Sequence, residues 1–211
     1  MKKVLFFSLL LFAVHTTGWA QGVDTTSPDL PADGAYISLD DFFYSGIGYV
    51  LDNPVLTPLA NITRTPVGDD EVESFTATFS ATETGQPLGA LDMSGPVDMI
   101  TSDRLLSTTG TFDAEIISMS LSGGGILIRE DPSRASTGQT DIIDLGGGLY
   151  HIDSFFDVFT EISINGGSSW TPSDNSVRMT LVPEPATLGL TVMGLFSVFL
   201  LRRIAPRRNQ W

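Results

Sequence analysis

Short runs of β-branched and aromatic residues alternate with clusters of Gly, Pro, Asn and Asp throughout residues 36–181. Runs of this composition favour β-strands, and the clusters between them favour tight turns. This part of the sequence lacks the long apolar period of about 3.6 residues that an amphipathic helix requires. The alternation therefore predicts an all-β body, and it constrains the fold more than any other feature of the chain.

The strands predicted from this alternation are mostly short. They cover residues 36–43, 48–51, 55–64, 73–82, 97–101, 111–122, 126–130, 140–145, 150–164 and 177–181. Many short strands without a repeat of fixed length are typical of an antiparallel β-sandwich or jelly roll, whereas a propeller needs several copies of one blade. We therefore predict a β-sandwich or jelly-roll domain over residues 36–181. Residues 21–35, which are rich in Thr, Ser, Pro, Asp and Gly, are predicted to form a flexible leader.

The strand at residues 150–164 is the most informative one, and it is expected to be bent or bulged. One of its faces is predicted to lie in the core and carries Ile152, Ser154, Phe156, Val158, Thr160, Ile162 and Ile164. The opposite face is predicted to be partly solvated and carries His151, Asp153, Phe155, Asp157, Phe159 and Glu161.

The body between residues 21 and 182 is strongly acidic and free of cysteine. Only Glu184 of the 25 Asp and Glu residues lies outside it, and six of the 11 Lys and Arg residues lie in the terminal segments. This leaves five arginines against 24 carboxylates and a formal net charge of −19. Such a surface opposes phosphate contacts, so no nucleic-acid partner is expected. The lack of cysteine excludes disulfides, thiolate zinc sites and cysteine nucleophiles, and burial of one core must hold the fold.

The N-terminus has the pattern of a secretory signal peptide. Lys2 and Lys3 precede an apolar run over residues 4–14, and Gly18-Trp19-Ala20 places small residues at the −3 and −1 positions of a cleavage site. A run of this length is too short for a stable membrane span. We therefore predict a signal-peptide helix over residues 1–20, with cleavage after Ala20.

The C-terminal residues 182–211 combine a rigid motif, an apolar run and a basic stop. Pro183-Glu184-Pro185 precedes an apolar run over residues 186–201, which is followed by Arg202, Arg203, Arg207 and Arg208. As a helix the run would be about 24 Å long, slightly less than a hydrocarbon core of about 30 Å, and snorkelling arginines would make up the difference. We predict a transmembrane helix over residues 186–201, with the arginines in the cytoplasm and the body outside.

This arrangement resembles the PEP-CTERM sorting signal of surface proteins of Gram-negative bacteria. The resemblance covers residues 182–211. It implies that an exosortase, a transpeptidase-like membrane protease, recognises Pro183-Glu184-Pro185, removes the tail and passes the body to the cell surface or the extracellular matrix. An ordinary C-terminal membrane anchor is the alternative. Residues 146–159 are also similar to Gly-rich stretches in other exported proteins with such tails, which implies a shared β-domain and says nothing about activity.

Residues 163–170 resemble an Asp-box, with Asn165 in the place of its Asp and Ser169 in the place of its Thr. In physical terms the stretch is a hairpin turn, in which the Asn165 side chain bonds the loop backbone and Trp170 packs beneath. A single copy indicates a turn and does not indicate a glycosidase.

The residues that could support catalysis are too far apart along the strand. His151, the one histidine outside the signal peptide, is followed by Asp153. Residues two apart on a strand are about 6–7 Å apart, beyond the hydrogen bond that a catalytic triad needs. The carboxylates Asp153, Asp157 and Glu161 recur at intervals of about 13 Å, wider than glycoside hydrolysis requires. No enzymatic activity is expected, and a secreted hydrolase would need a second carboxylate from another strand.

The acidic clusters at Asp40-Asp41 and at residues 69–73 do not match the spacing of an EF-hand loop. They would offer at most a weak surface calcium site, and no cofactor is expected. The glycine runs at residues 123–125 and 146–148 are predicted to be turns between strands.

Together these features predict an exported, non-enzymatic surface or matrix protein that is transiently anchored in the membrane. Its expected partners are an exosortase-type enzyme, the membrane before processing, and exopolysaccharide. The alternative is a carbohydrate-binding module, for which Phe155 and Phe159 beside Asp157 are the suggestive pattern.

Overall fold

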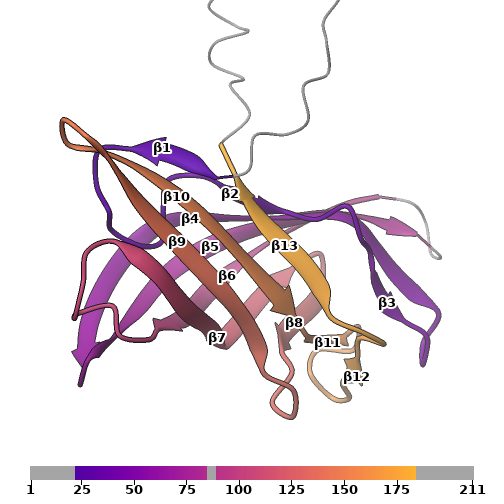
Figure 1. Cartoon of the computed structure of the whole chain (residues 1–211). Helices are drawn as coiled ribbons and strands as arrows, with labels where there is room; N and C mark the ends of the chain where they lie inside the picture. The colour runs from indigo at the N-terminus through magenta and orange to yellow at the C-terminus, as the bar shows by residue number, and fades with distance from the viewer. Residues whose placement is uncertain (1–21, 85–88, 184–211) are drawn as a thin grey trace, which may run out of the picture.

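The computed structural model describes residues 22–84 and 89–183, and every regular element in these ranges is a β-strand (Figure 1). The prediction of an all-β body is therefore confirmed. The strands are β1 (Val23–Thr25), β2 (Ala35–Ile37), β3 (Phe42–Tyr44), β4 (Tyr49–Val67), β5 (Asp70–Thr84), β6 (Ala90–Thr101), β7 (Gly110–Gly123), β8 (Ile126–Glu130), β9 (Ser136–Gly146), β10 (Leu149–Val158), β11 (Thr160–Ser163), β12 (Thr171–Pro172) and β13 (Val177–Val182). These ranges contain no helix of the length and hydropathy that a membrane crossing requires. The helices predicted for residues 1–20 and 186–201 lie outside the described ranges.

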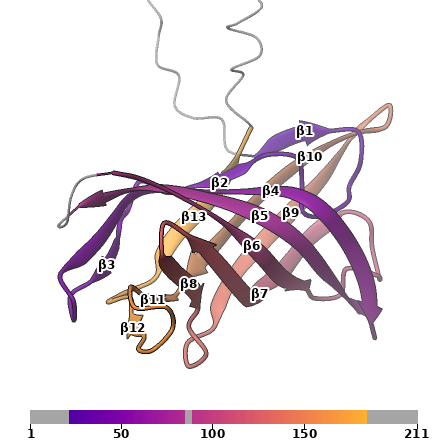
Figure 2. The same ribbon diagram turned by 180° about the vertical axis from the view of Figure 1, so that it is seen from behind.

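Eight of the strands close into an antiparallel barrel. The order around it is β2, β4, β5, β6, β7, β9, β10 and β13, and β13 pairs with β2 to complete the ring. Strand β9, which we call the seam, joins β7 to β10: its residues 136–142 pair with β7 and its residues 138–146 pair with β10. The other strands lie outside this ring (Figure 2). Strand β1 pairs with β10, β3 pairs with β4, and β8, β11 and β12 extend from the second half of β7.

This closed barrel replaces the predicted β-sandwich or jelly roll. A sandwich has two sheets with free edges, whereas β4 and β5 are long enough to curve along the molecule within one continuous sheet (Figure 1). Strand β4 has 19 residues, and its pairing with β5 shifts register between Asp52 and Val55. Asn53 has a φ of 52° at this point. The predicted break between strands at residues 48–51 and 55–64 is therefore an irregularity within one strand.

Apolar side chains that point inward from alternate positions fill the barrel. On β10 and β11 the predicted core face is confirmed from Ile152 to Ile162, where every even-numbered residue is buried. Ile164 was predicted on the same face but is 53% exposed, because β11 ends at Ser163 and the chain turns away. The expected bend is the break between β10 and β11 at Phe159.

Residues 21–35 were predicted to form a flexible leader, but residues 22–34 are packed against the barrel and Ala35 begins β2. Strand β1 pairs with β10, and Leu30 is fully buried. Two arginines hold the leader by its backbone. Arg64 Nε donates to the Leu30 carbonyl and Arg104 Nη2 donates to the Pro28 carbonyl, and both distances are 2.7 Å. The leader is held through its backbone carbonyls by arginines that lie elsewhere in the chain. Its own amino-acid composition therefore gave no sign of these contacts and suggested disorder.

The described chain begins and ends at the same place on the barrel. The Gly22 N–H donates to the Leu181 carbonyl at a distance of 3.0 Å, and β13 ends at Val182. In both ribbon views this place lies along the top of the molecule beside β1 (Figures 1 and 2). The two points from which the sequence continues into its predicted terminal signals therefore lie close together.

Candidate functional site

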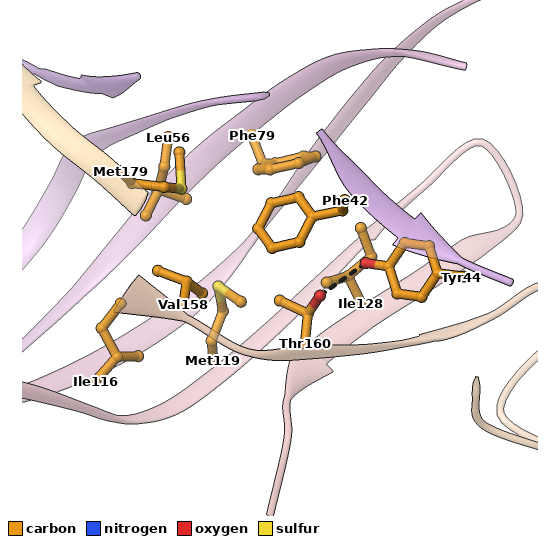
Figure 3. A pocket seen from close by; sticks show the side chains of 10 residues that line it. All are labelled: Phe42, Tyr44, Leu56, Phe79, Ile116, Met119, Ile128, Val158, Thr160 and Met179. Atoms are coloured by element: carbon orange, nitrogen blue, oxygen red, sulfur yellow. Dashed lines mark hydrogen bonds between the residues drawn. The ribbon is translucent and has the colours of Figure 1, made fainter. Parts of the chain in front are cut away.

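The barrel interior is tightly packed in the region that Figure 3 shows. Phe42, Phe79, Met179 and their neighbours surround a gap with about 10 Å³ available to the centre of a water-sized sphere. This is about the least volume that a water molecule needs, and a water would also need polar partners. The nearby hydroxyls of Tyr44 and Thr160 already bond each other at 2.7 Å. The gap therefore has room for at most one water molecule and no room for a ligand.

The interior is polar at the end of the barrel that the leader covers. Glu73 points inward from β5 and is fully buried, and its carboxyl oxygens accept from the Thr101 hydroxyl at 3.2 and 3.3 Å. Arg104, in the turn after β6, is buried and donates to two backbone carbonyls. Its guanidinium lies 5.4 Å from the centroid of the Phe112 ring, and its Nε has no hydrogen-bond partner among the described residues. A carboxyl and a guanidinium are thus both buried at this end.

A chain of buried hydroxyls adds to this polar region. The Tyr36 hydroxyl donates to Ser154 Oγ at 3.2 Å, and Ser154 Oγ bonds Thr140 Oγ1 at 2.9 Å. Burial raises the pKa of Tyr36 to about 12, against its bond to Ser154, and the charge of Glu73 adds to the rise. Polar side chains of β2, β9 and β10 therefore join those of β5 and β6 inside the barrel.

Glu73 is predominantly neutral at pH 7. Burial, together with the charge of nearby Glu71, raises the pKa of Glu73 to about 8, against the opposing effects of the Thr101 hydroxyl and of Arg104. A fully buried carboxyl does not touch a solute. Its evident role is to link β5 to β6, and its protonation state bears on stability more directly than on chemistry.

An open cleft of about 580 Å³ borders the same end, and it is lined by Asp29, Glu71, Arg104, Leu105, Leu106, Ser107 and Thr108. The Arg104 guanidinium binds the carbonyls of Pro28 and Ser107, so these two donor groups are already engaged. The two carboxylates of the cleft have no histidine, lysine or cysteine beside them among its lining residues. This set of groups does not supply an activated nucleophile or an acid–base pair.

The outer face of β10 and β11 carries stacked groups in place of an open aromatic platform. In each group a guanidinium lies 4.1–4.5 Å from the centroid of an aromatic ring and forms an ion pair of 2.6–2.7 Å with a carboxylate. The groups are Arg178 with Phe155 and Asp157, Arg134 with Phe159 and Asp131, and Arg129 with Trp170 and Glu161. Arginines therefore cover the faces of Phe155 and Phe159 that a sugar ring would need.

Three of the residues considered for catalysis, His151, Asp157 and Glu161, have side-chain partners on other elements. His151 Nδ1 lies 2.7 Å from Asp24 Oδ1, which belongs to β1. The structure thus joins His151 to the leader, and Asp153 is not its partner in this pair. Asp157 and Glu161 are bound by arginines, as described above.

The turn at residues 163–170 forms as predicted, between the paired strands β11 and β12. Asn165 Oδ1 accepts from Ser163 Oγ at 2.9 Å and from the Ser169 N–H at 3.0 Å. Gly166 and Gly167 have φ values of 69° and 87°, which residues other than glycine rarely adopt. The hairpin interpretation of this stretch is confirmed.

The acidic clusters take part in turn structure. Asp70 Oδ1 accepts from the Asp103 N–H at 2.8 Å, and Asp41 Oδ1 accepts from the Asn53 N–H at 3.2 Å. Within residues 22–84 and 89–183, His, Asp and Glu side chains do not gather in groups of three that could hold a metal ion.

Of the predicted sorting residues, the structure describes Pro183 alone, which is exposed directly after β13. Glu184 and Pro185, the stop formed by Arg202, Arg203, Arg207 and Arg208, and the cleavage residue Ala20 lie outside the described ranges.

The two buried charged residues of this region, Glu73 and Arg104, were missed from the sequence, whereas Ser154 was correctly predicted on a core face. Glu73 was assigned to an acidic surface cluster, although it stands in phase with Phe75 and Phe79, which point inward on the same strand. That phase was a usable signal. Arg104 lies in a turn, where no strand period applies, so the sequence offers no comparable signal for it.

Comparison with known proteins finds no protein-family model, no curated protein and no solved structure that matches this chain. Its function has to be inferred from its own residues and geometry.

Proposed function

We propose that this protein is a non-enzymatic β-barrel domain that is exported, anchored transiently in the membrane and sorted to the cell surface or extracellular matrix. Residues 1–20 act as the signal peptide and residues 186–201 as the membrane anchor. An exosortase-type enzyme acts at Pro183-Glu184-Pro185. The observation that carries this proposal is the position of the two chain ends, because both signals continue from one place on a closed domain.

The geometry of the ends suits a domain that is trimmed on both sides. Strand β1 begins at Val23 and β13 ends at Val182, so cleavage after Ala20 and at the proline motif would leave every strand intact. Between them, Gly22 bonds Leu181 at 3.0 Å. Release of the tail would therefore leave β13 paired with β10 and β2.

The distribution of charge supports a display role over an enzymatic one. The five arginines of the body all bind carboxylates or backbone carbonyls, through Arg64, Arg104, Arg129, Arg134 and Arg178. Most of the 24 carboxylates have no such cation, which gives an anionic surface that favours solubility outside the cell. Exopolysaccharide, named above as a partner, would have to be recognised without the ring faces of Phe155 and Phe159.

The sorting motif is tested by replacing Pro183-Glu184-Pro185 with alanines in the native host. The expected result is a full-length, membrane-bound protein, because the enzyme no longer recognises the tail. The matched control replaces Asn209-Gln210-Trp211, three residues beyond the arginines, and should be processed normally. Unchanged processing of the first variant would refute the sorting role, and a wild-type tail that is never removed would identify an ordinary anchor.

A further inference from the structure

We propose that the tip of the β9–β10 hairpin is a lipid-contacting surface, which holds the barrel against the membrane while the C-terminal tail is present. This inference rests on the proposed function, since it requires the tail to be anchored in the membrane.

The tip consists of Ile143, Leu145 and Leu149 around a turn of three glycines. These side chains are 47%, 53% and 47% exposed. Pairing between β9 and β7 stops at Ile142, so the remainder of the hairpin projects beyond this part of the barrel wall (Figure 1). Large aliphatic side chains gathered on a projecting tip indicate contact with an apolar partner.

The tip lies on the side of the molecule where the chain ends are found. Its strand β10 pairs with β1, with Tyr150 opposite Thr25, and β1 follows directly on Gly22. Figures 1 and 2 both show the hairpin turn, β1 and the ends of the described chain along the top of the molecule. This arrangement would let one flat surface meet the tip and the chain ends together.

The length of the connection places the membrane close to this side. Two residues, Glu184 and Pro185, separate Pro183 from the apolar run over residues 186–201. An extended chain spans at most about 3.6 Å per residue, so a bilayer that takes up the run lies within about 10–15 Å of the end of β13. A barrel tethered this tightly keeps its tip beside the lipid, which raises the effective concentration of the contact.

The charges near the tip define the kind of lipid. Asp144 accepts from the Gly146 N–H within the turn, and the hydrogen-bonded side chains of His151 and Asp24 lie next to Ile143 on the neighbouring strands. These carboxylates, and the body charge of −19, oppose anionic headgroups. The partner is therefore a zwitterionic bilayer surface, and added anionic lipid should weaken the contact.

The absence of cysteine from the chain allows a direct test with single labels. Leu145→Cys and Ile164→Cys are matched, since both residues are 53% exposed and both lie in or beside hairpin turns, but Ile164 is in the turn after β11. Each full-length variant carries an environment-sensitive dye and is reconstituted in phosphatidylcholine vesicles that contain lipid-attached quenchers. Circular dichroism checks that both variants keep the wild-type strand content, and Leu149→Cys serves as a second tip position.

The expected result is that quenching at position 145 exceeds that at position 164 by about twofold or more, as for side chains that reach the boundary of headgroups and acyl chains. Addition of phosphatidylglycerol should reduce the difference. If the chain floats with the vesicles but both positions are quenched equally, the tip inference is overturned and the anchor stands. If the chain does not float, the anchor itself fails, and the inference with it. A further measurement is made in detergent without vesicles. If the dye signal at position 145 then changes with protein concentration, the partner is a second copy of the chain, and the inference is also overturned.

Discussion

The substitution Glu73→Gln tests whether the polar end of the barrel interior sets the pH dependence of stability. The carboxamide keeps an acceptor for the Thr101 hydroxyl and has the shape of the protonated acid. It cannot ionise. The variant should therefore behave like the wild type where Glu73 is protonated in both states and should be more stable than the wild type at higher pH.

The magnitude follows from the two pKa values. Burial raises the pKa of Glu73 from an ordinary value of 4.5 to about 8, so the folded state holds the proton more tightly than the unfolded state. This stabilisation is complete below the unfolded pKa and is lost as pH rises through the folded one. At about 1.4 kcal/mol per pKa unit, the wild type loses about 3 kcal/mol by pH 7 and up to about 5 kcal/mol by pH 9, relative to the variant.

The assay is urea unfolding of the full chain in mild detergent between pH 4.5 and pH 9, followed by far-ultraviolet circular dichroism. Glu130, whose pKa burial raises to about 7 with added effects of neighbouring carboxylates, affects both proteins alike, so the difference between them is the quantity to measure. Asp92→Asn removes one exposed negative charge and is the control for general repulsion. Parallel pH profiles for wild type and Glu73→Gln would show that Glu73 is not buried and neutral in the folded protein.

Three further substitutions test the seam, the core and the leader. Gly138→Ala at the seam should destabilise the barrel by about 1–3 kcal/mol or more, because the added Cβ would overlap the Phe155 carbonyl. The control is Gly46→Ala, whose added Cβ would lie 3.1 Å from the Thr171 methyl and should lower the urea midpoint less. Tyr44→Phe should reduce the unfolding free energy by about 1–3 kcal/mol, because it leaves the buried Thr160 hydroxyl without its partner, and a loss under about 0.5 kcal/mol would contradict this. Leu30→Ala should reduce it by about 2–5 kcal/mol and expose residues 22–34 to protease, whereas Leu39→Ala, at a site that is 83% exposed, should do neither.

The sequence predicted local structure better than closure. The alternation over residues 150–164 identified the buried face of β10 and β11, and Asn165 with its glycines identified the turn that follows. The barrel was not predicted, because closure depends on pairing between strands that are far apart in sequence, β13 with β2 and β9 with β7, and no local pattern encodes such a pairing. A strand was predicted over residues 97–101, but β6 begins at Ala90 and runs through Gly95 and Pro96.

The candidate site shows the same division. Glu73 could have been found from its phase with Phe75, whereas the burial of Arg104 arises from carbonyls of the leader and of its own turn. Hydrogen bonds such as that between His151 and Asp24 join residues far apart in sequence, and spacing along one strand cannot reveal them.

The ring is completed by the last strand of the body, and this sets an order of events for a chain that emerges N-terminus first. Strand β13 lies between β10 and β2, so residues 155–158 of β10 and one side of β2 stay unpaired until residues 177–182 have emerged. Only Pro183, Glu184 and Pro185 separate the end of β13 from the apolar run over residues 186–201. Under the proposed export, the whole body is therefore translocated before the barrel closes, and the proposed membrane anchor follows the last strand directly.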